Sequence, residues 1–257
     1  MFPISDDNPT LRTPVVTFAL LAITWTVWMI VQGAGGAAGA DGPYRLIASV
    51  CNYGLVPGEL TRMAPVGFGV PIGPGVQCVV DNEPVNLLTP VLSIFLHGSW
   101  SHIIGNSLYL WVFGNNVEDS MGRVRFLVFY LLTGVVAAAT HVFIDPASPV
   151  PTVGASGAIS GIMGAYLLLY PRVHVRTFFP PFFFFRVPAW VVLILWFVSQ
   201  VITGLPQLTA LPGVQGGVAV WAHIGGFVAG ALLARVFARR ELVRRREAAG
   251  DAKAVWT

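Results

Sequence analysis

Residues 218–237 read VAVWAHIGGFVAGALLARVF, and Arg235 is the one formally charged side chain in these twenty positions. The hydrocarbon core of a bilayer needs about 20 predominantly apolar residues per helix, so this stretch predicts a membrane-spanning helix. Five further apolar runs occur at residues 14–32, 100–116, 126–143, 156–170 and 189–204. We therefore predict an all-α polytopic membrane protein, built as a bundle of six transmembrane helices. The run at 156–170 is short, and we expect it not to reach both faces of the membrane.

The composition of the whole chain agrees with a membrane location. Of its 257 residues, 55% are hydrophobic and 11% are charged, against roughly 25% charged in ordinary soluble domains; the mean hydropathy is +0.71. So few charges could not cover the surface of a soluble protein of this length. A net charge of +3 is also too small for a phosphate-binding face. These numbers exclude a cytosolic globular enzyme, a disordered chain and a nucleic-acid-binding protein, and they make the lipid bilayer the first expected partner.

The basic residues predict the orientation, because Lys and Arg are enriched in short cytoplasmic segments. With the N-terminus inside, 13 of the 15 basic residues fall on the cytoplasmic side, and Arg45 and Arg62 fall outside. We expect residues 1–13 and the basic tail at 239–257 to be cytoplasmic, flanking a six-helix domain at 14–238. No basic region precedes the first span, which favours a retained helix over a cleaved signal peptide. A prokaryotic cytoplasmic membrane suits an Arg-rich tail that faces anionic lipid.

The connections between the predicted spans are unequal in length. The long first outer loop, at 33–99, is rich in Gly and Pro, and long loops are often functional. It holds both cysteines, Cys51 and Cys78; an even count in an oxidising compartment favours a disulfide, and the alternative is two free, buried thiols. The second outer loop, at 205–217, carries no charge. The segment 171–188 places phenylalanines between prolines and predicts an interfacial aromatic hairpin.

Polar residues at membrane depth are costly, so each is a candidate functional residue. Ser156 opens the predicted helix at 156–170, where unpaired backbone N–H groups and the helix dipole favour negative charge. A serine at that position can be a plain N-cap. Gly154 and Gly157 flank it, however, and leave room for an extended chain to approach the hydroxyl. Ser156 is therefore also a candidate nucleophile.

His223 lies near the outer end of the sixth predicted span. A solitary histidine there could hydrogen-bond between helices, bind a metal or carry a proton. Gly226 and Gly230 make a G-x-x-x-G step, and the fourth predicted span has the same step at 157–161. Such faces let two helix backbones approach closely. Packing them together brings Ser156 and His223 within plausible hydrogen-bonding reach, as a nucleophile needs an adjacent base.

His102 and Asn106 are spaced i, i+4 and share one face of the second predicted span. Their side chains, with the backbone N–H of Ser156, could stabilise the oxyanion of a tetrahedral intermediate. The alternative is an interhelical polar pair that only holds the bundle together. The one outer-side acid near the fourth span is Asp145, and none lies at the depth of His223. The residues therefore predict a Ser–His dyad rather than a triad.

Taken together, these residues resemble the rhomboid intramembrane serine proteases, of the bacterial type with a six-helix core. The motifs that carry the resemblance fall in the family's order: HGSWSHIIGN at 97–106, GNNVEDSMGRVRF at 114–126, GASG at 154–157 and AHIGGFVAG at 222–230. The resemblance covers roughly residues 85–238. It implies hydrolysis of peptide bonds in the transmembrane segments of other membrane proteins, without a cofactor and without a metal.

The resemblance assigns roles by position. It makes Ser156 the nucleophile and His223 the general base, and it makes His102, Asn106 and the Ser156 N–H the oxyanion-binding groups. Gly154 and Gly157 correspond to the glycines around the nucleophile, and the active site is expected to open to the outer face of the membrane.

Other segments correspond to substrate gating and to structure. The loop at 205–217 and the fifth helix occupy the positions associated with gating. Glu118 and Arg125 correspond to structural residues of a cytoplasmic turn.

Two positions depart from the family's pattern. Many members carry an aromatic residue four positions after the nucleophile, stacked on the histidine, and this chain has Ser160 there. The Trp-Arg pair of the first outer loop is missing from 33–99. The alternatives are an inactive rhomboid-like protein that binds membrane helices, and a six-helix transporter or metal-binding channel that uses His97, His102 and His223.

Overall fold

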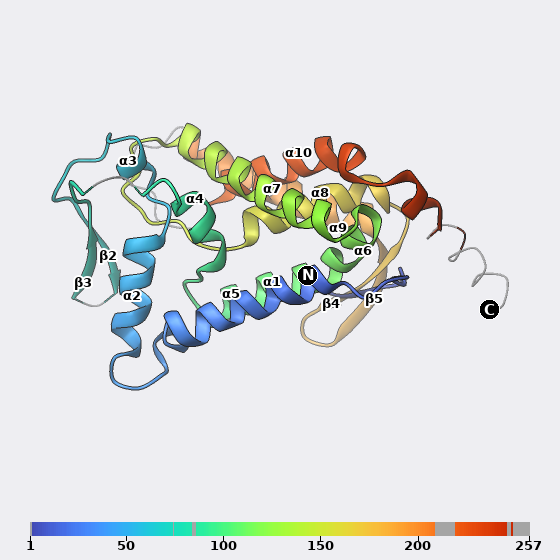
Figure 1. The fold of residues 1–257 in the computed structure, drawn as a ribbon, viewed down its shortest axis with the longest axis horizontal. Coiled ribbons are helices and arrows are strands. Elements are labelled where there is room, and N and C mark those ends of the chain that lie inside the picture. The colour runs from blue at the N-terminus through green and yellow to red at the C-terminus, as the bar shows by residue number, and fades with distance from the viewer. Residues whose placement is uncertain (1, 74, 84–85, 209–218, 246–247, 249–257) are drawn as a thin grey trace.

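The structure, a computed structural model, describes residues 2–73, 75–83, 86–208, 219–245 and 248. The chain is mostly helical (Figure 1). The main helices are α1 (Val15–Thr26), α2 (Gly42–Tyr53), α5 (Trp100–Tyr109), α6 (Asn115–Met121), α7 (Arg123–Ile144), α8 (Ser156–Leu169), α9 (Ala189–Gly204) and α10 (Val220–Phe237). Two further one-turn helices are α3 (Pro57–Leu60) and α4 (Thr89–Leu92). The short helix η4 (Leu110–Gly114) links α5 to α6, so residues 100–121 form one continuous helical run.

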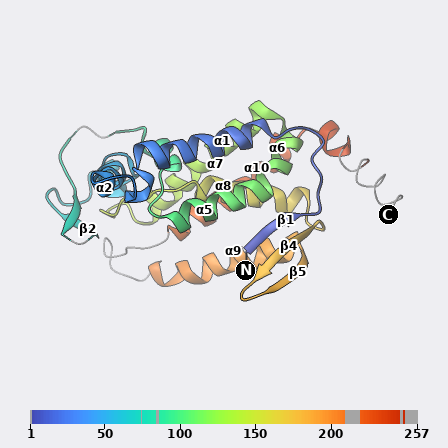
Figure 2. The same cartoon turned by 90° about the horizontal axis from the view of Figure 1, so that it is seen from below.

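Among the residues that the structure describes, three helices are long and apolar enough to cross a membrane: α7, α10, and α9 extended to Leu208. Two more apolar helices are shorter, Val15–Val31 and Ser156–Leu169. The second of these, α8, is central: ten of its fourteen residues are buried. Figure 2 shows α1 and α9 on opposite sides of the bundle, with α8 between them.

Helices α8 and α10 touch through their backbones. A Cβ atom added at Gly226 would lie 2.1 Å from the carbonyl oxygen of Gly157, and one at Gly230 would lie 1.9 Å from that of Gly161. Only glycine permits this approach, which is the way small residues bring membrane helices together. The two G-x-x-x-G steps therefore face each other and fix the spacing of the two helices.

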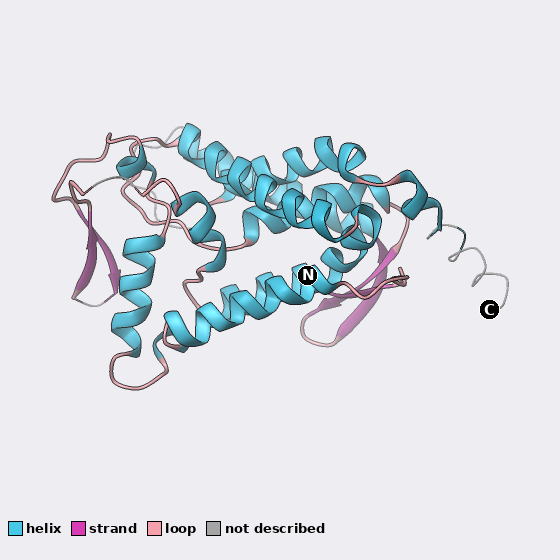
Figure 3. Ribbon diagram, viewed as in Figure 1, coloured by secondary structure: helices cyan, strands magenta, loops and turns pink. Residues whose placement is uncertain are grey.

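Two small sheets lie at opposite ends of the bundle (Figure 3), and the all-α prediction did not include them. The first is a hairpin of β4 (His174–Phe179) and β5 (Phe183–Pro188), within the segment predicted to be an aromatic hairpin. Strand β1 (Phe2–Asp6) pairs antiparallel with β4 and gives the order β1-β4-β5. Five residues at the chain start are too few to reveal a strand by alternation.

The segment between α1 and α5 is more regular than a loop. It holds α2, α3, α4 and the hairpin of β2 (Gly69–Gly73) with β3 (Val76–Val79). Cys51 on α2 and Cys78 on β3 form a disulfide with a Cα–Cα distance of 5.4 Å, which confirms the favoured alternative. The disulfide ties the hairpin to α2 at the end of the bundle opposite β4 and β5 (Figure 1).

The turn from α6 to α7 anchors the start of α1. Glu118 is buried and accepts hydrogen bonds from the backbone N–H groups of Val16 at 3.0 Å and Thr17 at 2.8 Å, and from the Thr17 hydroxyl at 2.8 Å. These N–H groups belong to the first turn of α1 and have no partner within the helix. Arg125 reaches the other way, with Nη1 3.3 Å from the Phe237 carbonyl oxygen at the end of α10.

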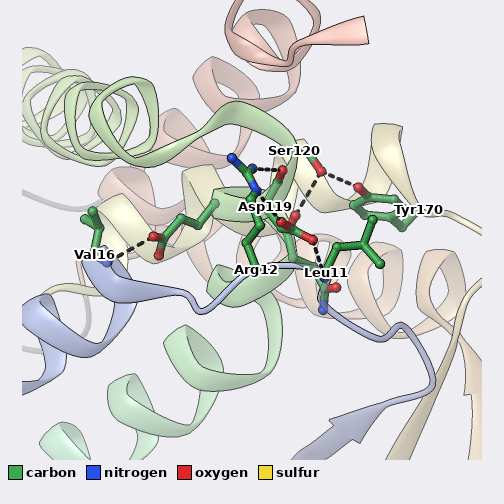
Figure 4. Close-up of polar contacts among 8 residues, drawn as sticks. Leu11, Arg12, Val16, Asp119, Ser120 and Tyr170 are labelled. Carbon is green, nitrogen blue, oxygen red and sulfur yellow. Dashed lines mark hydrogen bonds and ion pairs between the residues drawn. The ribbon is translucent and has the colours of Figure 1, made fainter. Parts of the chain in front are cut away.

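Asp119 extends the same anchor towards the chain start (Figure 4). Its carboxylate accepts from the Leu11 N–H at 2.8 Å and from the Arg12 side chain at 2.9 Å. The neighbouring Ser120 hydrogen-bonds to the Tyr170 hydroxyl just after α8. The turn therefore connects α1, α6 and α8 at the end of the bundle that carries β4 and β5.

Candidate active site

A cavity of about 620 Å³ lies among α5, α7 and the N-terminal parts of α8 and α10. Its walls also include residues that precede α5 and α8, and Trp196 of α9. All four side chains proposed from the sequence line it: His102, Asn106, Ser156 and His223. Residues separated by more than a hundred positions in the sequence thus share one cavity.

Ser156 is the first residue of α8, and its side chain faces His223. Its Oγ lies 2.7 Å from His223 Nε2. The N-cap of α8 is Ala155, and no side chain caps the helix. The plain N-cap alternative for Ser156 is therefore wrong, since the hydroxyl points to an imidazole instead of to the backbone of its own helix.

His223 lies in the first turn of α10 and is buried, with 8% of its surface exposed. Its second ring nitrogen, Nδ1, lies 2.8 Å from Gln200 Oε1 of α9. The indole of Trp196, one turn earlier on α9, lies 5.8 Å from the imidazole between ring centroids, with 38° between the planes. Hydrogen-bond partners therefore face both ring nitrogens of His223, and the Trp196 indole packs against one face of the ring.

Sequence reasoning did not single out Gln200. The available signal was its amide within the apolar run of 189–204, because polar side chains at membrane depth are rarely incidental. Gln200 is 23 positions from His223 in the sequence. The two side chains meet only because α9 packs against α10, which the sequence does not reveal.

His102 and Asn106 lie on α5 and line the same cavity as His223 of α10. The ring of His102 packs against Gly154: a Cβ there would lie 2.6 Å from its Cε1 and Nε2 atoms. Gly154 also has a φ of +127°, a conformation that glycine adopts at no steric cost. Both observations require glycine at the position two residues before Ser156.

Asn106 is oriented by His97. Its Nδ2 lies 2.9 Å from His97 Nε2, and the rings of His97 and His102 meet edge to face at 5.0 Å. An amide nitrogen carries two protons, so a bond to His97 leaves Asn106 one donor. His97 is itself fully buried and acts behind the cavity wall.

Ser160 has a local role. Its hydroxyl donates to the Ser156 carbonyl oxygen at 2.6 Å, one turn back on α8. It is buried and replaces the aromatic residue expected at this position. The aromatic face near His223 comes instead from Trp196, on a different helix.

The expectations of a gating loop at 205–217 and of a cytoplasmic basic tail at 239–257 concern residues that the structure describes only in part. Most of the loop at 205–217, and most of the tail at 239–257 beyond Arg245, lie outside the described residues. Within the described parts of the chain, no three His, Cys, Asp or Glu side chains are grouped closely enough to hold a metal ion.

The fold and this cavity define a class: a helical integral membrane protein in which a serine and a histidine from two apolar helices are hydrogen-bonded in a cavity. Comparison with known proteins gives the family. The family model described as the rhomboid domain matches residues 82–240. The chain belongs to the rhomboid family.

Individual relatives agree with that assignment. The chain is 41% identical over 102 residues to the rhomboid protease GluP of Bacillus subtilis, covering 39% of this chain and 18% of that protein. It is 35% identical over 91 residues to the putative rhomboid protease YdcA of the same organism, covering 35% and 44%. It is 29% identical over 155 residues to the rhomboid protease AarA of Providencia stuartii, covering 55% and 53%. Each match thus spans about half or less of the relative's own length.

Proposed function

We propose that this protein is an intramembrane serine endopeptidase that cleaves transmembrane segments of other membrane proteins through a Ser156–His223 dyad. The observation that carries the proposal is the 2.7 Å distance between Ser156 Oγ and His223 Nε2. A serine hydroxyl is a weak nucleophile until an adjacent base takes its proton, and this pair supplies both groups. Kinship with rhomboid proteases supports the same chemistry.

The reaction is acyl transfer in two halves. His223 Nε2 takes the proton of Ser156 Oγ as that oxygen bonds to the carbonyl carbon of the scissile peptide. The imidazolium then gives its proton to the leaving amine as the C–N bond breaks. In the second half, His223 takes a proton from water, the water oxygen attacks the acyl-enzyme, and the proton returns to Ser156 as the ester bond breaks.

The negative oxygen of each tetrahedral intermediate needs donors aimed at it. The Ser156 backbone N–H is unpaired within α8 because it belongs to the first turn. The remaining Asn106 proton and the His102 ring complete the proposed oxyanion site from α5. The close packing of Gly154 on His102 keeps that ring beside the nucleophile.

Water must reach Ser156 from one side of the membrane. In the proposed topology, the chain passes through the bilayer as six helical segments within residues 14–238, of which α8 is too short to reach both faces. Residues 1–13 and 239–257 are cytoplasmic, and the cavity opens to the outer face. The support for this orientation is the distribution of Lys and Arg. Because α8 is short, we propose that its N-terminal end lies below the outer surface, where irregular backbone that lines a cavity is tolerated.

A substrate helix must unwind to present a carbonyl to Ser156, because its backbone is already hydrogen-bonded within the helix. We therefore expect preferred substrates to carry small or helix-breaking residues near the scissile bond. Glycine or proline in a helix lowers the cost of unwinding by about 1 to 3 kcal/mol per residue.

The alternative is an inactive rhomboid-like protein that binds membrane helices without cutting them. Such a protein has no need of both members of the dyad, whereas here Ser156 and His223 are both present and hydrogen-bonded to each other. Purified protein, reconstituted with a tagged model transmembrane substrate, separates the two possibilities. We expect a cut within the substrate's membrane segment by the wild type, loss of the cut in His223→Ala, and no effect of a metal chelator. Binding without any cut would favour the inactive alternative, and full activity in His223→Ala would remove the dyad.

A further inference from the structure

The proton positions beside the active site follow from one backbone carbonyl on α9. Ser199 Oγ lies 2.6 Å from the Trp196 carbonyl oxygen. A carbonyl oxygen can only accept, so the single hydroxyl proton of Ser199 lies on this bond. The Ser199 oxygen is left with lone pairs alone for its other neighbour, Gln200.

Gln200 then has one allowed orientation. Its Nε2 lies 3.2 Å from Ser199 Oγ and donates to it. This contact turns the amide oxygen the other way, where Oε1 lies 2.8 Å from His223 Nδ1. Because an amide oxygen also only accepts, the His223 proton is on Nδ1.

A neutral imidazole with its proton on Nδ1 has a free lone pair on Nε2. Nε2 is the atom that lies 2.7 Å from Ser156 Oγ, so the serine donates and the histidine accepts. The opposite tautomer would carry a proton on Nε2 and could not take another from the serine while neutral. The hydrogen bond on one ring nitrogen decides which tautomer is present.

We propose that Gln200 is a positioning residue, which holds His223 in the tautomer and ring orientation needed for a general base. The inference rests on the proposed acyl transfer at Ser156 and adds the group that supports the base. The sequence predicts only the pair Ser156 and His223. The added group extends this pair into a chain of hydrogen bonds, each with a fixed donor, that begins at the Trp196 carbonyl oxygen on α9.

Burial makes this acceptor hard to replace. His223 is 8% exposed, so bulk water has little access to its Nδ1 atom. Within the described residues, no carboxylate is hydrogen-bonded to the His223 ring. The Trp196 ring restrains one face of the imidazole but offers no acceptor in the ring plane. The amide oxygen of Gln200 is therefore the group that fixes the proton.

The test measures how fast Ser156 reacts in the full-length protein, independently of substrate binding. A fluorophosphonate forms a bond from phosphorus to Ser156 Oγ, the phosphorus–fluorine bond breaks, fluoride leaves, and the serine proton passes to His223 Nε2. Gln200→Met keeps the length and shape of the side chain and removes the acceptor. Gln200→Glu keeps an acceptor oxygen and should restore the rate. Thr203→Ala is the control, because Thr203 is exposed one turn beyond Ser199 on α9 and, among the described residues, its hydroxyl donates only to the Ser199 carbonyl oxygen of its own helix.

We expect Gln200→Met to lower the labelling rate and kcat about tenfold, near the upper end of the effect of losing one neutral hydrogen bond. KM and the apparent Tm should stay close to the wild-type values, Gln200→Glu should recover most of the rate, and Thr203→Ala should match the wild type. A Gln200→Met protein that labels at the wild-type rate would overturn the inference, as would an equal loss in Gln200→Met and Gln200→Glu. If instead the wild type is not labelled on Ser156, the proposed function fails and the inference fails with it.

Discussion

Replacing Gly226 by alanine should separate the two helices that hold Ser156 and His223. The added Cβ would lie 2.1 Å from the carbonyl oxygen of Gly157, where ordinary contacts begin at 3.4 Å. The obstacle is backbone, which no side-chain rotation can relieve, so α8 and α10 must move apart by about 1.3 Å at this level.

The displacement acts close to the chemistry. Gly157 directly follows Ser156, and Gly226 lies one turn after His223 on α10. The distance from Ser156 Oγ to His223 Nε2 should therefore grow from 2.7 Å to about 4 Å, beyond the roughly 2.6–3.2 Å over which a general base takes a proton. General-base catalysis contributes about 10²- to 10⁴-fold, so kcat should fall at least about a hundredfold. Overpacking should also cost about 1–3 kcal/mol of stability.

The assay is the initial rate of cleavage of a model transmembrane substrate, with apparent Tm in detergent measured in parallel. Val228→Ala is the matched control, because Val228 lies on the same helix with 43% of its surface exposed; it should keep both the rate and the Tm. Cleavage by Gly226→Ala at the wild-type rate, with a wild-type Tm, would mean that the two helices are not in backbone contact at this position.

Three further predictions concern the framework around the site. Glu118→Ala should lower the free energy of unfolding by about 3 kcal/mol, because three donors lose their buried, charged acceptor. Glu118→Gln should lower it by less. Equal apparent Tm values in the wild type and both variants would contradict this. Replacing Cys51 and Cys78 together by serine should lower the free energy of unfolding by up to about 3.5 kcal/mol, because the disulfide closes a loop of 27 residues. The variant should have a lower Tm, equal to that of the reduced wild type. A wild-type Tm that does not change under reduction would contradict this. Burial raises the pKa of Glu59, and repulsion from the Asp81 carboxylate raises it further. A hydrogen bond from the Asp81 backbone lowers the pKa, but by less. Because the folded state then holds this proton more tightly than the unfolded state, stability should fall as pH rises from 4.5 through the raised pKa, and Glu59→Gln should flatten this part of the Tm–pH curve.

Much of the bundle was predictable because the bilayer imposes a length and a composition on each span. The run at 189–204 coincides with α9, and 156–170 overlaps α8 to within one residue. The close approach of α8 and α10 was also predictable, because each helix carries a G-x-x-x-G step and such steps are typical of helices whose backbones pack closely.

What escaped prediction depends on contacts between distant parts of the chain. β1 exists because β4 offers it an edge, and five residues carry no usable periodicity. The segment 33–99 folds into α2 and the β2–β3 hairpin because a disulfide and local packing support it, although its glycines and prolines suggest a loop. Gln200 could be noticed as polar, but its partner His223 is defined only by how α9 packs on α10.

The proposed function depends on the attack of Ser156 on the substrate's peptide bond. Its most direct test is the rate at which wild-type protein and Ser156→Ala, purified side by side and equally folded by apparent Tm, cut a model transmembrane substrate in proteoliposomes. We expect a cut inside the membrane segment by the wild type and none by Ser156→Ala. Cleavage at the same bond and rate by Ser156→Ala would contradict it.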